Sequence, residues 1–177
     1  PEYYKMFAEE TFEFDGRAAA NTRNRNPLLG LGIGADGLKT GHTSEAGYGL
    51  VGSALQGERR VIFVITGLRS QSVRADEAEA IVNWAFRQFT EKKYGRKNDV
   101  IGLAPVWNGA SPQVGLALAE DLNLLVPVFD GDDINFNAEL KTPITAPLSK
   151  GAAIGNLIIS RPNLPTFKVP LVAAENI

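Results

Sequence analysis

The sequence predicts a mixed α/β (α+β) domain with an antiparallel sheet, followed by a small all-β domain. Three strand-like segments come first, at residues 37–43, 48–55 and 60–66, and one amphipathic helical pattern follows them. After that helix the helical periodicity stops, and short strand-like segments alternate with turn residues. A chain of 177 residues has room for one medium domain or two small ones. We therefore place a boundary near residue 96 and predict two domains, residues 1–95 and 97–177.

An irregular segment precedes the first strands. Residues 1–35 include an Asn-rich stretch, and four glycines lie between Gly30 and Gly37. This is typical of loops, because Gly and Asn tolerate a positive φ. Residues 56–59 supply a turn between the second and third strands, and the β-branched run at 61–65 suits a central strand.

The predicted helix extends from Asp76 to about Lys93. Asp76 and Glu79 have the spacing of an N-terminal capping box. The apolar residues of this segment recur at spacings of three and four, which places them on one face. They are Ala78, Ile81, Val82, Ala85, Phe86 and Phe89.

The second domain is expected to be a small β-sandwich or barrel, because short strands at regular spacing with turn signals between them are typical of both. The turn signals are Asn108-Gly109, residues 130–133 and residues 161–163. The strand-like segments are residues 99–106, 113–119, 122–128, 134–140, 152–159 and 165–171.

Composition limits the function classes. The chain is 44% hydrophobic and 21% charged, as in soluble globular proteins, and has no apolar run long enough to span a bilayer. Its net charge of −2 argues against nucleic acid or an acidic membrane surface as the main partner. The absence of cysteine excludes disulfides, zinc–thiolate sites and thiol catalysis. The 177 residues contain no signal peptide, and we expect a targeting segment to lie upstream in a longer precursor.

The run from Asp36 to Thr43 contains the tripeptide Lys39-Thr40-Gly41, followed by His42. Lys-Thr-Gly is one of three motifs that build the active site of penicillin-interacting serine enzymes. The other two are missing: no serine has a lysine three residues later, and none has an asparagine two residues later. The sequence therefore carries part of such a site without its nucleophile.

The flanks of this motif give the match its specificity. Residues 24–84 resemble D-alanyl-D-alanine carboxypeptidases, the low-molecular-mass penicillin-binding proteins. The likeness rests on Arg25-Asn26, Leu28-Leu29, Asp36-Gly37, Ala46-Gly47-Tyr48, Ser53-Ala54, Gly57, Arg60 and residues 83–86. It implies that residues 1–95 are the later part of a transpeptidase/β-lactamase-like domain and that residues 97–177 are the family's C-terminal β domain.

The resemblance also implies roles for six residues. Lys39 sets the protonation of the serine site, the Thr40 hydroxyl binds the terminal carboxylate, and Gly41 lets the substrate lie against the strand. The backbone N–H of His42 contributes to the oxyanion hole. Strand alternation puts Lys39 and Gly41 on one face and Thr40 on the other. The remaining two are Arg74, expected just before the helix and paired with the substrate carboxylate, and Arg25, near the cleft.

By this likeness the intact protein is a serine-type D-Ala-D-Ala carboxypeptidase that trims peptidoglycan stem peptides and is acylated by penicillins. It is expected in the periplasm or another extracytoplasmic compartment, with a possible membrane tether beyond the C-terminus. The chain alone should be inactive and should pair with its own N-terminal half; no cofactor, metal or nucleic acid is expected. Two alternatives stay open: a β-lactamase of the same fold, and a non-catalytic module that binds the cell wall or other proteins.

Four further features of the sequence bear on possible sites. His42 is the only histidine, and without partners it makes a metal site improbable. The acidic residues at 130–133 lack the glutamate of a calcium loop and suggest a polar turn. Lys141-Thr142-Pro143 has Pro where Gly is required and receives no role. Trp107 is expected at a hairpin tip, where an exposed aromatic ring can touch a partner.

Overall fold

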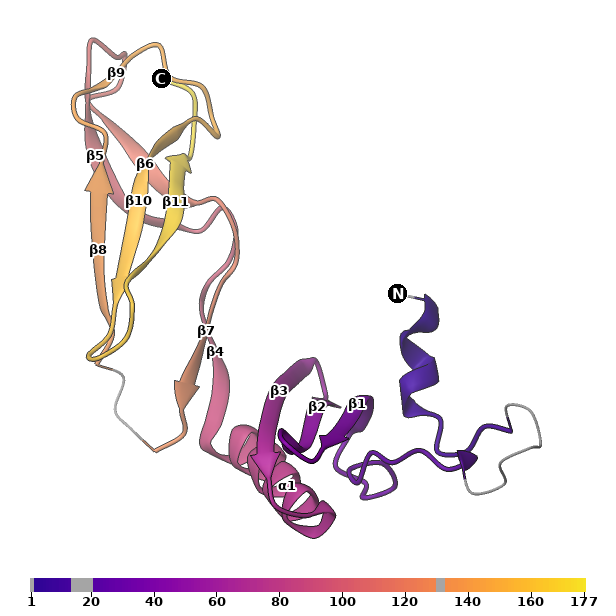
Figure 1. The fold of residues 1–177 in the computed structure, drawn as a ribbon. Helices are drawn as coiled ribbons and strands as arrows, with labels where there is room; N and C mark the ends of the chain where they lie inside the picture. The colour runs from indigo at the N-terminus through magenta and orange to yellow at the C-terminus, as the bar shows by residue number, and fades with distance from the viewer. Residues whose placement is uncertain (1, 14–20, 130–132) are drawn as a thin grey trace. The chain divides into compact units, whose positions relative to one another are not determined.

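The computed structural model describes residues 2–13, 21–129 and 133–177. The chain forms two compact units that meet in sequence between Gln88 and Phe89, and each is described by itself (Figure 1). The sequence analysis placed the boundary near residue 96. Residues 89–95 are counted with the second unit because they form a strand that pairs there.

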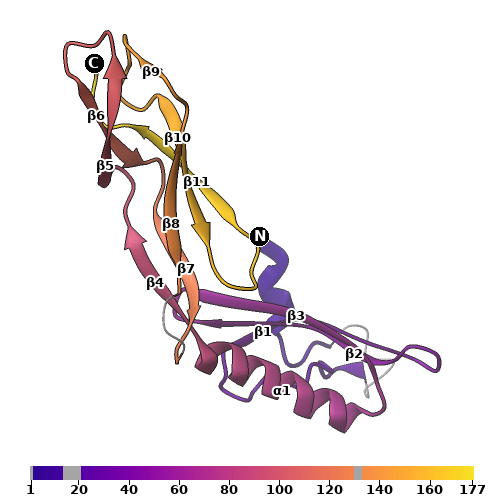
Figure 2. The same cartoon turned by 90° about the vertical axis from the view of Figure 1, so that its left-hand side faces the viewer.

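The first unit is a three-stranded antiparallel sheet with one long helix. After the 3₁₀ helix η1 (Glu2–Ala8), the strands β1 (Ala35–Thr43), β2 (Gly47–Gln56) and β3 (Arg59–Leu68) follow one another in space as in sequence. The three predicted strands are confirmed within two residues at each end. Helix α1 (Gln71–Gln88) lies along one face of this sheet (Figures 1 and 2).

Both predicted ends of the helix are wrong. α1 begins at Gln71, because the Oγ atom of Ser70 accepts a hydrogen bond from the backbone N–H of Val73 at 3.1 Å and caps the first turn. Asp76 therefore lies inside the helix and caps nothing. The helix ends at Gln88, and the next residues form the strand β4 (Phe89–Gly95), which pairs with β7 (Leu122–Pro127). Residues 89–95 form a strand and not the end of the helix because they pair with the distant strand β7, although Phe89 continues the helical spacing of apolar residues.

The core of the first unit lies between the sheet and α1. Leu50 and Ala54 of β2 pack against Ala78 and Val82 of α1, and Leu28 joins them from the preceding loop. All five side chains are buried. The spacing of four residues on both elements turns these side chains toward the same interface.

A polar cluster ties η1 to the sheet. The hydroxyl of Tyr4 donates to Oγ of the fully buried Ser53 at 2.7 Å, and Nη1 of Arg60 donates to the same Oγ at 2.6 Å. Arg60 also forms an ion pair of 2.7 Å with Asp36, and this hydrogen-bonded carboxylate raises the pKa of Arg60 above its usual value. Since none of the residues in η1 is buried, these bonds hold the N-terminal segment against the start of β1.

The second unit is all-β. Its larger sheet has the order β8-β10-β11-β6-β5-β9, and its smaller sheet is the pair β4-β7. All six predicted segments are strands, whereas β4 and the short β9 were not expected. The strands not yet given bounds are β5 (Val100–Trp107), β6 (Gln113–Leu118), β8 (Asn135–Leu140), β9 (Ile144–Thr145), β10 (Ala153–Ser160) and β11 (Phe167–Ala173).

The two sheets of this unit share one core, as in a small sandwich. Leu122, Leu124 and Val126 of β7 pack against Leu157 of β10 and Leu171 of β11. The alternation along β7 turns every second side chain inward, which leaves Leu125 on the outside.

Two of the turns predicted in the second unit are seen in the structure, and the third lies mostly outside the described residues. Asn108 and Asn163 have φ angles of 58° and 59°, as expected of Asn in tight turns. Trp107 is exposed at the end of β5, next to the first of these turns. Of the acidic turn at 130–133, residues 130–132 lie outside the described residues. Lys141-Thr142-Pro143 follows β8 and takes no part in the site described below.

Among the residues that the structure describes, no helix is long and apolar enough to cross a membrane.

Replacing Leu171 with alanine is expected to lower the free energy of unfolding of the second unit by about 2–5 kcal/mol, the usual cost of a Leu→Ala cavity in a core. Leu171 is fully buried in the sandwich. Urea unfolding followed by the fluorescence of Trp107, with Trp84 replaced by Phe in all variants, measures this change. Leu125→Ala is the matched control, because its side chain is 50% exposed and should cost about 0.5 kcal/mol or less. Equal costs for the two variants would contradict this sandwich core.

Candidate functional site

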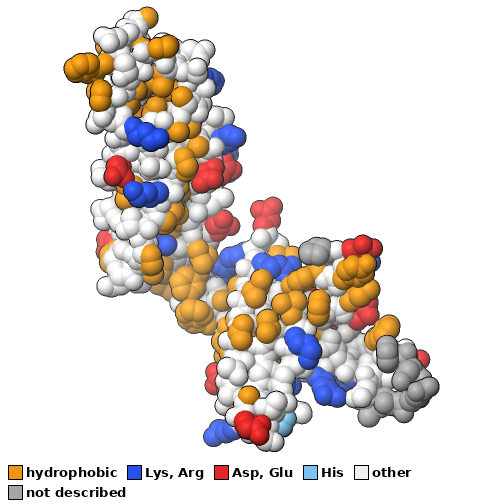
Figure 3. Space-filling view, turned by 45° about the horizontal axis from the view of Figure 1, so that its top comes forward, with side chains coloured by type: hydrophobic (Ala, Val, Ile, Leu, Met, Phe, Trp, Pro, Cys, Tyr) orange, Lys and Arg blue, Asp and Glu red, His pale blue; other side chains and the backbone are white. Residues whose placement is uncertain are grey.

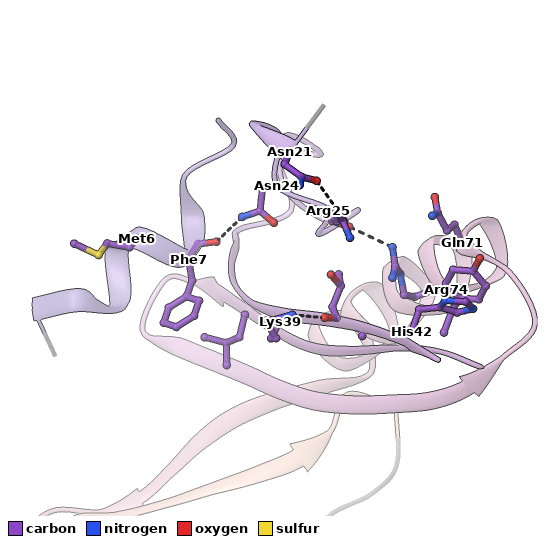
Figure 4. A pocket seen from close by; sticks show the side chains of 13 residues that line it. Met6, Phe7, Asn21, Asn24, Arg25, Lys39, His42, Gln71 and Arg74 are labelled. Carbon is purple, nitrogen blue, oxygen red and sulfur yellow. Dashed lines mark hydrogen bonds between the residues drawn. The ribbon is translucent and has the colours of Figure 1, made fainter. Parts of the chain in front are cut away.

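The Lys-Thr-Gly tripeptide lies on β1, an edge strand of the three-stranded sheet, and one wall of a pocket of about 800 Å³ follows this strand (Figure 4). The pocket brings together all six residues that the sequence singled out, from three separate segments of the chain. The lining residues are Met6, Phe7, Asn21, Asn24, Arg25, Leu38, Lys39, Thr40, Gly41, His42, Tyr48, Gln71 and Arg74.

The pocket follows the free edge of β1. Residues 38–42 all contribute to its lining, although successive side chains of a strand point to opposite faces. A cavity can touch both faces only where it wraps around an edge. Lys39 and Gly41 are more exposed than Thr40 between them, in line with the predicted alternation. The Nζ atom of Lys39 donates to the backbone carbonyl of Thr40 at 2.5 Å.

The turn after β1 fixes the far end of this wall. Oγ1 of Thr43 accepts a hydrogen bond from the N–H of Ala46 at 3.0 Å. Gly47 has a φ of 65°, and a Cβ at this position would lie 2.8 Å from the carbonyl oxygen of Leu68, so that glycine is required. With the turn held in this way, His42 on β1 and Tyr48 on β2 are direct cross-strand partners.

Arg74 is the most constrained side chain of the site. The sequence analysis placed it just before the helix; it lies inside the first turn of α1, because the helix begins earlier than predicted. It is only 6% exposed, and its Nη2 donates to the backbone carbonyl of Arg25 at 3.3 Å. Its Nε has no hydrogen-bond partner among the described residues. Burial lowers the pKa of Arg74, and the proximity of Tyr48 opposes this effect in part.

The charge of Arg74 is therefore buried, and no carboxylate among residues 2–13, 21–129 and 133–177 compensates it. A buried N–H without a partner costs about 1–3 kcal/mol, and a cation in the first turn of a helix also opposes the helix dipole. Arginine remains protonated at any physiological pH. The arrangement thus favours an anion that enters the pocket and accepts these donors.

Arg25 and the neighbouring asparagines form the opposite wall. Nη2 of Arg25 donates to Oδ1 of Asn21 at 2.8 Å. Nδ2 of Asn24 donates to the backbone carbonyls of Phe7 and Glu9 at 3.3 Å and 3.0 Å, and so holds this segment against the end of η1 (Figure 4). This contact places Met6 and Phe7 in the pocket wall, at the end away from Arg74 (Figure 4).

The pocket lining is positively charged. Among the lining residues that the structure describes, three carry a positive charge, namely Arg25, Lys39 and Arg74, and none is Asp or Glu. The hydroxyl of Thr40 adds a neutral donor, and a guanidinium can grip a carboxylate through two parallel hydrogen bonds. A carboxylate is the ligand group that this donor set fits best.

Sequence reasoning missed several lining residues, of which Tyr48 is the most informative. Its ring centroid lies 3.9 Å from that of His42. Counting back from the turn at residues 43–47 would have placed the two residues opposite each other. No pattern in the sequence indicated the other lining residues, because tertiary packing brings them to the site. Met6 and Phe7 lie on η1, Gln71 begins α1, and Asn21 lies between η1 and β1. No group of His, Cys, Asp and Glu suited to hold a metal occurs in the described part of the chain.

The fold and the pocket agree with the class of protein that comparison with known families defines. The chain belongs to the family described as penicillin-binding protein 5, C-terminal domain, whose model matches residues 89–177. Residues 1–70, which include β1 and most of the pocket, match the family D-alanyl-D-alanine carboxypeptidase. The resemblance inferred from Lys39-Thr40-Gly41 and its flanks is thereby confirmed.

Particular relatives sharpen this assignment. The chain is 30% identical to D-alanyl-D-alanine carboxypeptidase DacD and 32% identical to DacC, both of Escherichia coli, over 179 aligned residues. Each match covers 100% of this chain but 45% and 44% of those relatives. The crystal structure of penicillin binding protein 5 from Haemophilus influenzae superposes with a TM-score of 0.75 at 31% identity, over 99% of this chain and 51% of that one. The predicted fold class is confirmed, and the chain spans about half the length of the proteins it matches.

Proposed function

We propose that this chain supplies the substrate-carboxylate wall of a serine-type D-Ala-D-Ala carboxypeptidase, which trims peptidoglycan stem peptides and is acylated by β-lactams. The observation that carries the proposal is Arg74, which lies beside the Lys-Thr-Gly edge of β1, is buried, and has no acidic partner in the part of the chain that the structure describes. A substrate that ends in a D-alanine carboxylate would neutralise this charge.

Each residue then has a chemical task. Thr40 and Arg74 hold the terminal carboxylate, and Arg25 adds positive charge at the opposite wall. Gly41 has nothing within 4 Å of the position that a Cβ would take, so a peptide can lie against the strand. The N–H of His42 is one oxyanion donor, and loss of such a donor typically costs about 3 kcal/mol in the transition state. Lys39 sets the protonation of the nucleophile.

The nucleophile itself is a serine that this chain does not contain, since no Ser-x-x-Lys sequence occurs in it. A segment outside these 177 residues must therefore supply it, and the second oxyanion donor would come from the same serine. The side of the sheet that faces away from α1 is the surface we assign to that segment. We further propose an extracytoplasmic, periplasmic location, a possible membrane tether beyond the C-terminus, and a role in cell shape through wall trimming.

The carboxylate wall can be tested with the chain alone. N-acetyl-D-Ala-D-Ala should bind to the pocket, whereas the same dipeptide with a C-terminal amide should bind at least about tenfold more weakly, because it cannot accept a charge-assisted bidentate pair. Chemical-shift titration of the isotope-labelled chain measures both affinities. Equal affinities for acid and amide would contradict the proposal.

The catalytic half of the proposal needs the serine-bearing segment. Intact-mass spectra after penicillin should show an adduct on the protein that contains this segment, and an unchanged mass for the 177-residue chain. Turnover of a D-Ala-D-Ala peptide by the chain alone would overturn the assignment of the nucleophile to another segment. Rapid release of hydrolysed penicillin instead of a long-lived adduct would make the protein a β-lactamase.

A further inference from the structure

We infer that Tyr48 is a positioning residue of the carboxylate site, whose aromatic ring holds both Arg74 and the end of β1 that carries His42. The inference rests on the proposed function, and it assigns the work to the ring of Tyr48 rather than to its hydroxyl group.

The contacts of Tyr48 join the two halves of the site. Its ring lies 3.9 Å from the His42 ring, centroid to centroid, with an interplanar angle of 30°. The guanidinium carbon of Arg74 lies over the same ring at 5.7 Å from its centroid. The Tyr48 side chain, on β2, thus contacts both the strand β1 and the helix α1.

The end of β1 has few other side-chain anchors. Gly41 is paired with Gly49 across the ladder, so that neither residue supplies a side chain to pack against its neighbour. His42 is exposed, and its ring contact with Tyr48 is a cross-strand aromatic pair of the kind that stabilises a ladder. Without that ring, the backbone ladder and the turn bond of Thr43 would hold the N–H of His42 in place.

The geometry also suits Arg74. An aromatic ring attracts a guanidinium through its face, whereas carboxylates bind to the N–H groups at the guanidinium edge. Tyr48 therefore restrains the cation without using the donors that the ligand needs. Only the 3.3 Å hydrogen bond from Nη2 to the Arg25 carbonyl draws on those donors, and Nε has no partner among the described residues.

Two substitutions separate the ring from the hydroxyl group. Tyr48→Phe keeps the ring and should bind N-acetyl-D-Ala-D-Ala within about twofold of the unaltered chain. Tyr48→Leu removes the ring and should weaken binding about tenfold, in the range that cation–π and aromatic contacts support. If Tyr48→Leu does not fold, Tyr48→Val takes its place, since a β-branched residue suits this strand position. Tyr94→Leu, in the second unit, is the control for loss of a tyrosine elsewhere.

A second readout reports the geometry itself. His42 is the only histidine, so its imidazole proton signals need no assignment, and the ring current of Tyr48 should shift them upfield. This shift should persist in Tyr48→Phe and Tyr94→Leu and disappear in Tyr48→Leu. A purely structural role of Tyr48 would lower thermal stability without changing affinity in the folded variant.

The outcomes are distinct. A folded Tyr48→Leu variant that binds the dipeptide as well as the unaltered chain does would overturn the inference and leave the proposed function standing. The inference would also be overturned if Tyr48→Phe lost as much affinity for the dipeptide as Tyr48→Leu, because the hydroxyl group would then be responsible for the effect. Absence of dipeptide binding by the unaltered chain would overturn the proposed function, and the positioning role with it, whatever the His42 signals show.

Discussion

Replacing Arg74 with methionine is expected to abolish carboxylate binding and, at the same time, to raise the free energy of unfolding of the first unit. The side chain is 6% exposed, its pKa is lowered by burial, and its Nε has no partner among the described residues. Removal of a buried, unpaired charged group of this kind should stabilise the unliganded chain by about 1–2 kcal/mol. The lost contact with the Tyr48 ring acts in the opposite direction, but at 5.7 Å from the ring centroid it lies near the 6 Å limit of such contacts, and we expect the relieved desolvation to outweigh it.

The affinity for the carboxylate ligand should fall, whereas the free energy of unfolding rises. Loss of a buried, charge-assisted partner costs about 2–5 kcal/mol of binding free energy, or roughly 30-fold to several thousand-fold in affinity. Thermal unfolding with and without N-acetyl-D-Ala-D-Ala measures both effects together. At a ligand concentration of 100 times the Kd of the unaltered chain, that chain should gain about 2.7 kcal/mol, and Arg74→Met should gain less than about 0.9 kcal/mol.

Arg25→Met is the matched control for Arg74→Met, because the same change is made at an exposed arginine of the same pocket. It should weaken binding less and should not stabilise the chain, since its guanidinium is solvated and bonded to Asn21. An Arg74→Met variant that is less stable than the unaltered chain would show that the contacts of the guanidinium with the Arg25 carbonyl and the Tyr48 ring outweigh its desolvation, and would remove the main support for the anion site.

Placing lysines at Ile62 and Val64 together should turn an associating chain into a monomer. Both side chains are on β3 and are 60% and 68% exposed, on the side of the sheet opposite the core residues Phe63 and Ile65. β3 is an edge strand of its sheet among the described residues. A long apolar edge strand is a template for pairing between chains. Apolar side chains also gather over the first unit in the space-filling view (Figure 3).

Sedimentation velocity over a concentration series measures this effect. The unaltered chain should show reversible association, and the double variant should shift the apparent dissociation constant upward by at least about tenfold, because each lysine desolvated without a partner costs more than 1.4 kcal/mol. Leu103→Lys in the second unit is the control, since Leu103 is 64% exposed on another sheet. The assignment of the Ile62 and Val64 face to association between chains would be contradicted if the unaltered chain were monomeric. It would also be contradicted if Leu103→Lys raised the dissociation constant as much as the double variant. Addition of the serine-bearing segment should suppress association by covering the same surface.

The sequence by itself determined most of the strands and the candidate residues of the site. The β-branched run of β3 and the Gly- and Asn-containing turns act locally, and for this reason the predicted strands agree closely with those observed. Lys39-Thr40-Gly41 and the two arginines were recognised from the motif and spacing of the family that they resemble, which are contained in the sequence itself. The tertiary structure decided the rest. The segment Phe89–Gly95 became a strand because β7 pairs with it, and Ser70 moved the helix start by capping it. Arg74 became an unpaired buried cation, and Tyr48 its neighbour, only through the packing of α1 on the sheet. Burial and cross-strand contact depend on residues far apart in the chain, and a local pattern does not contain them.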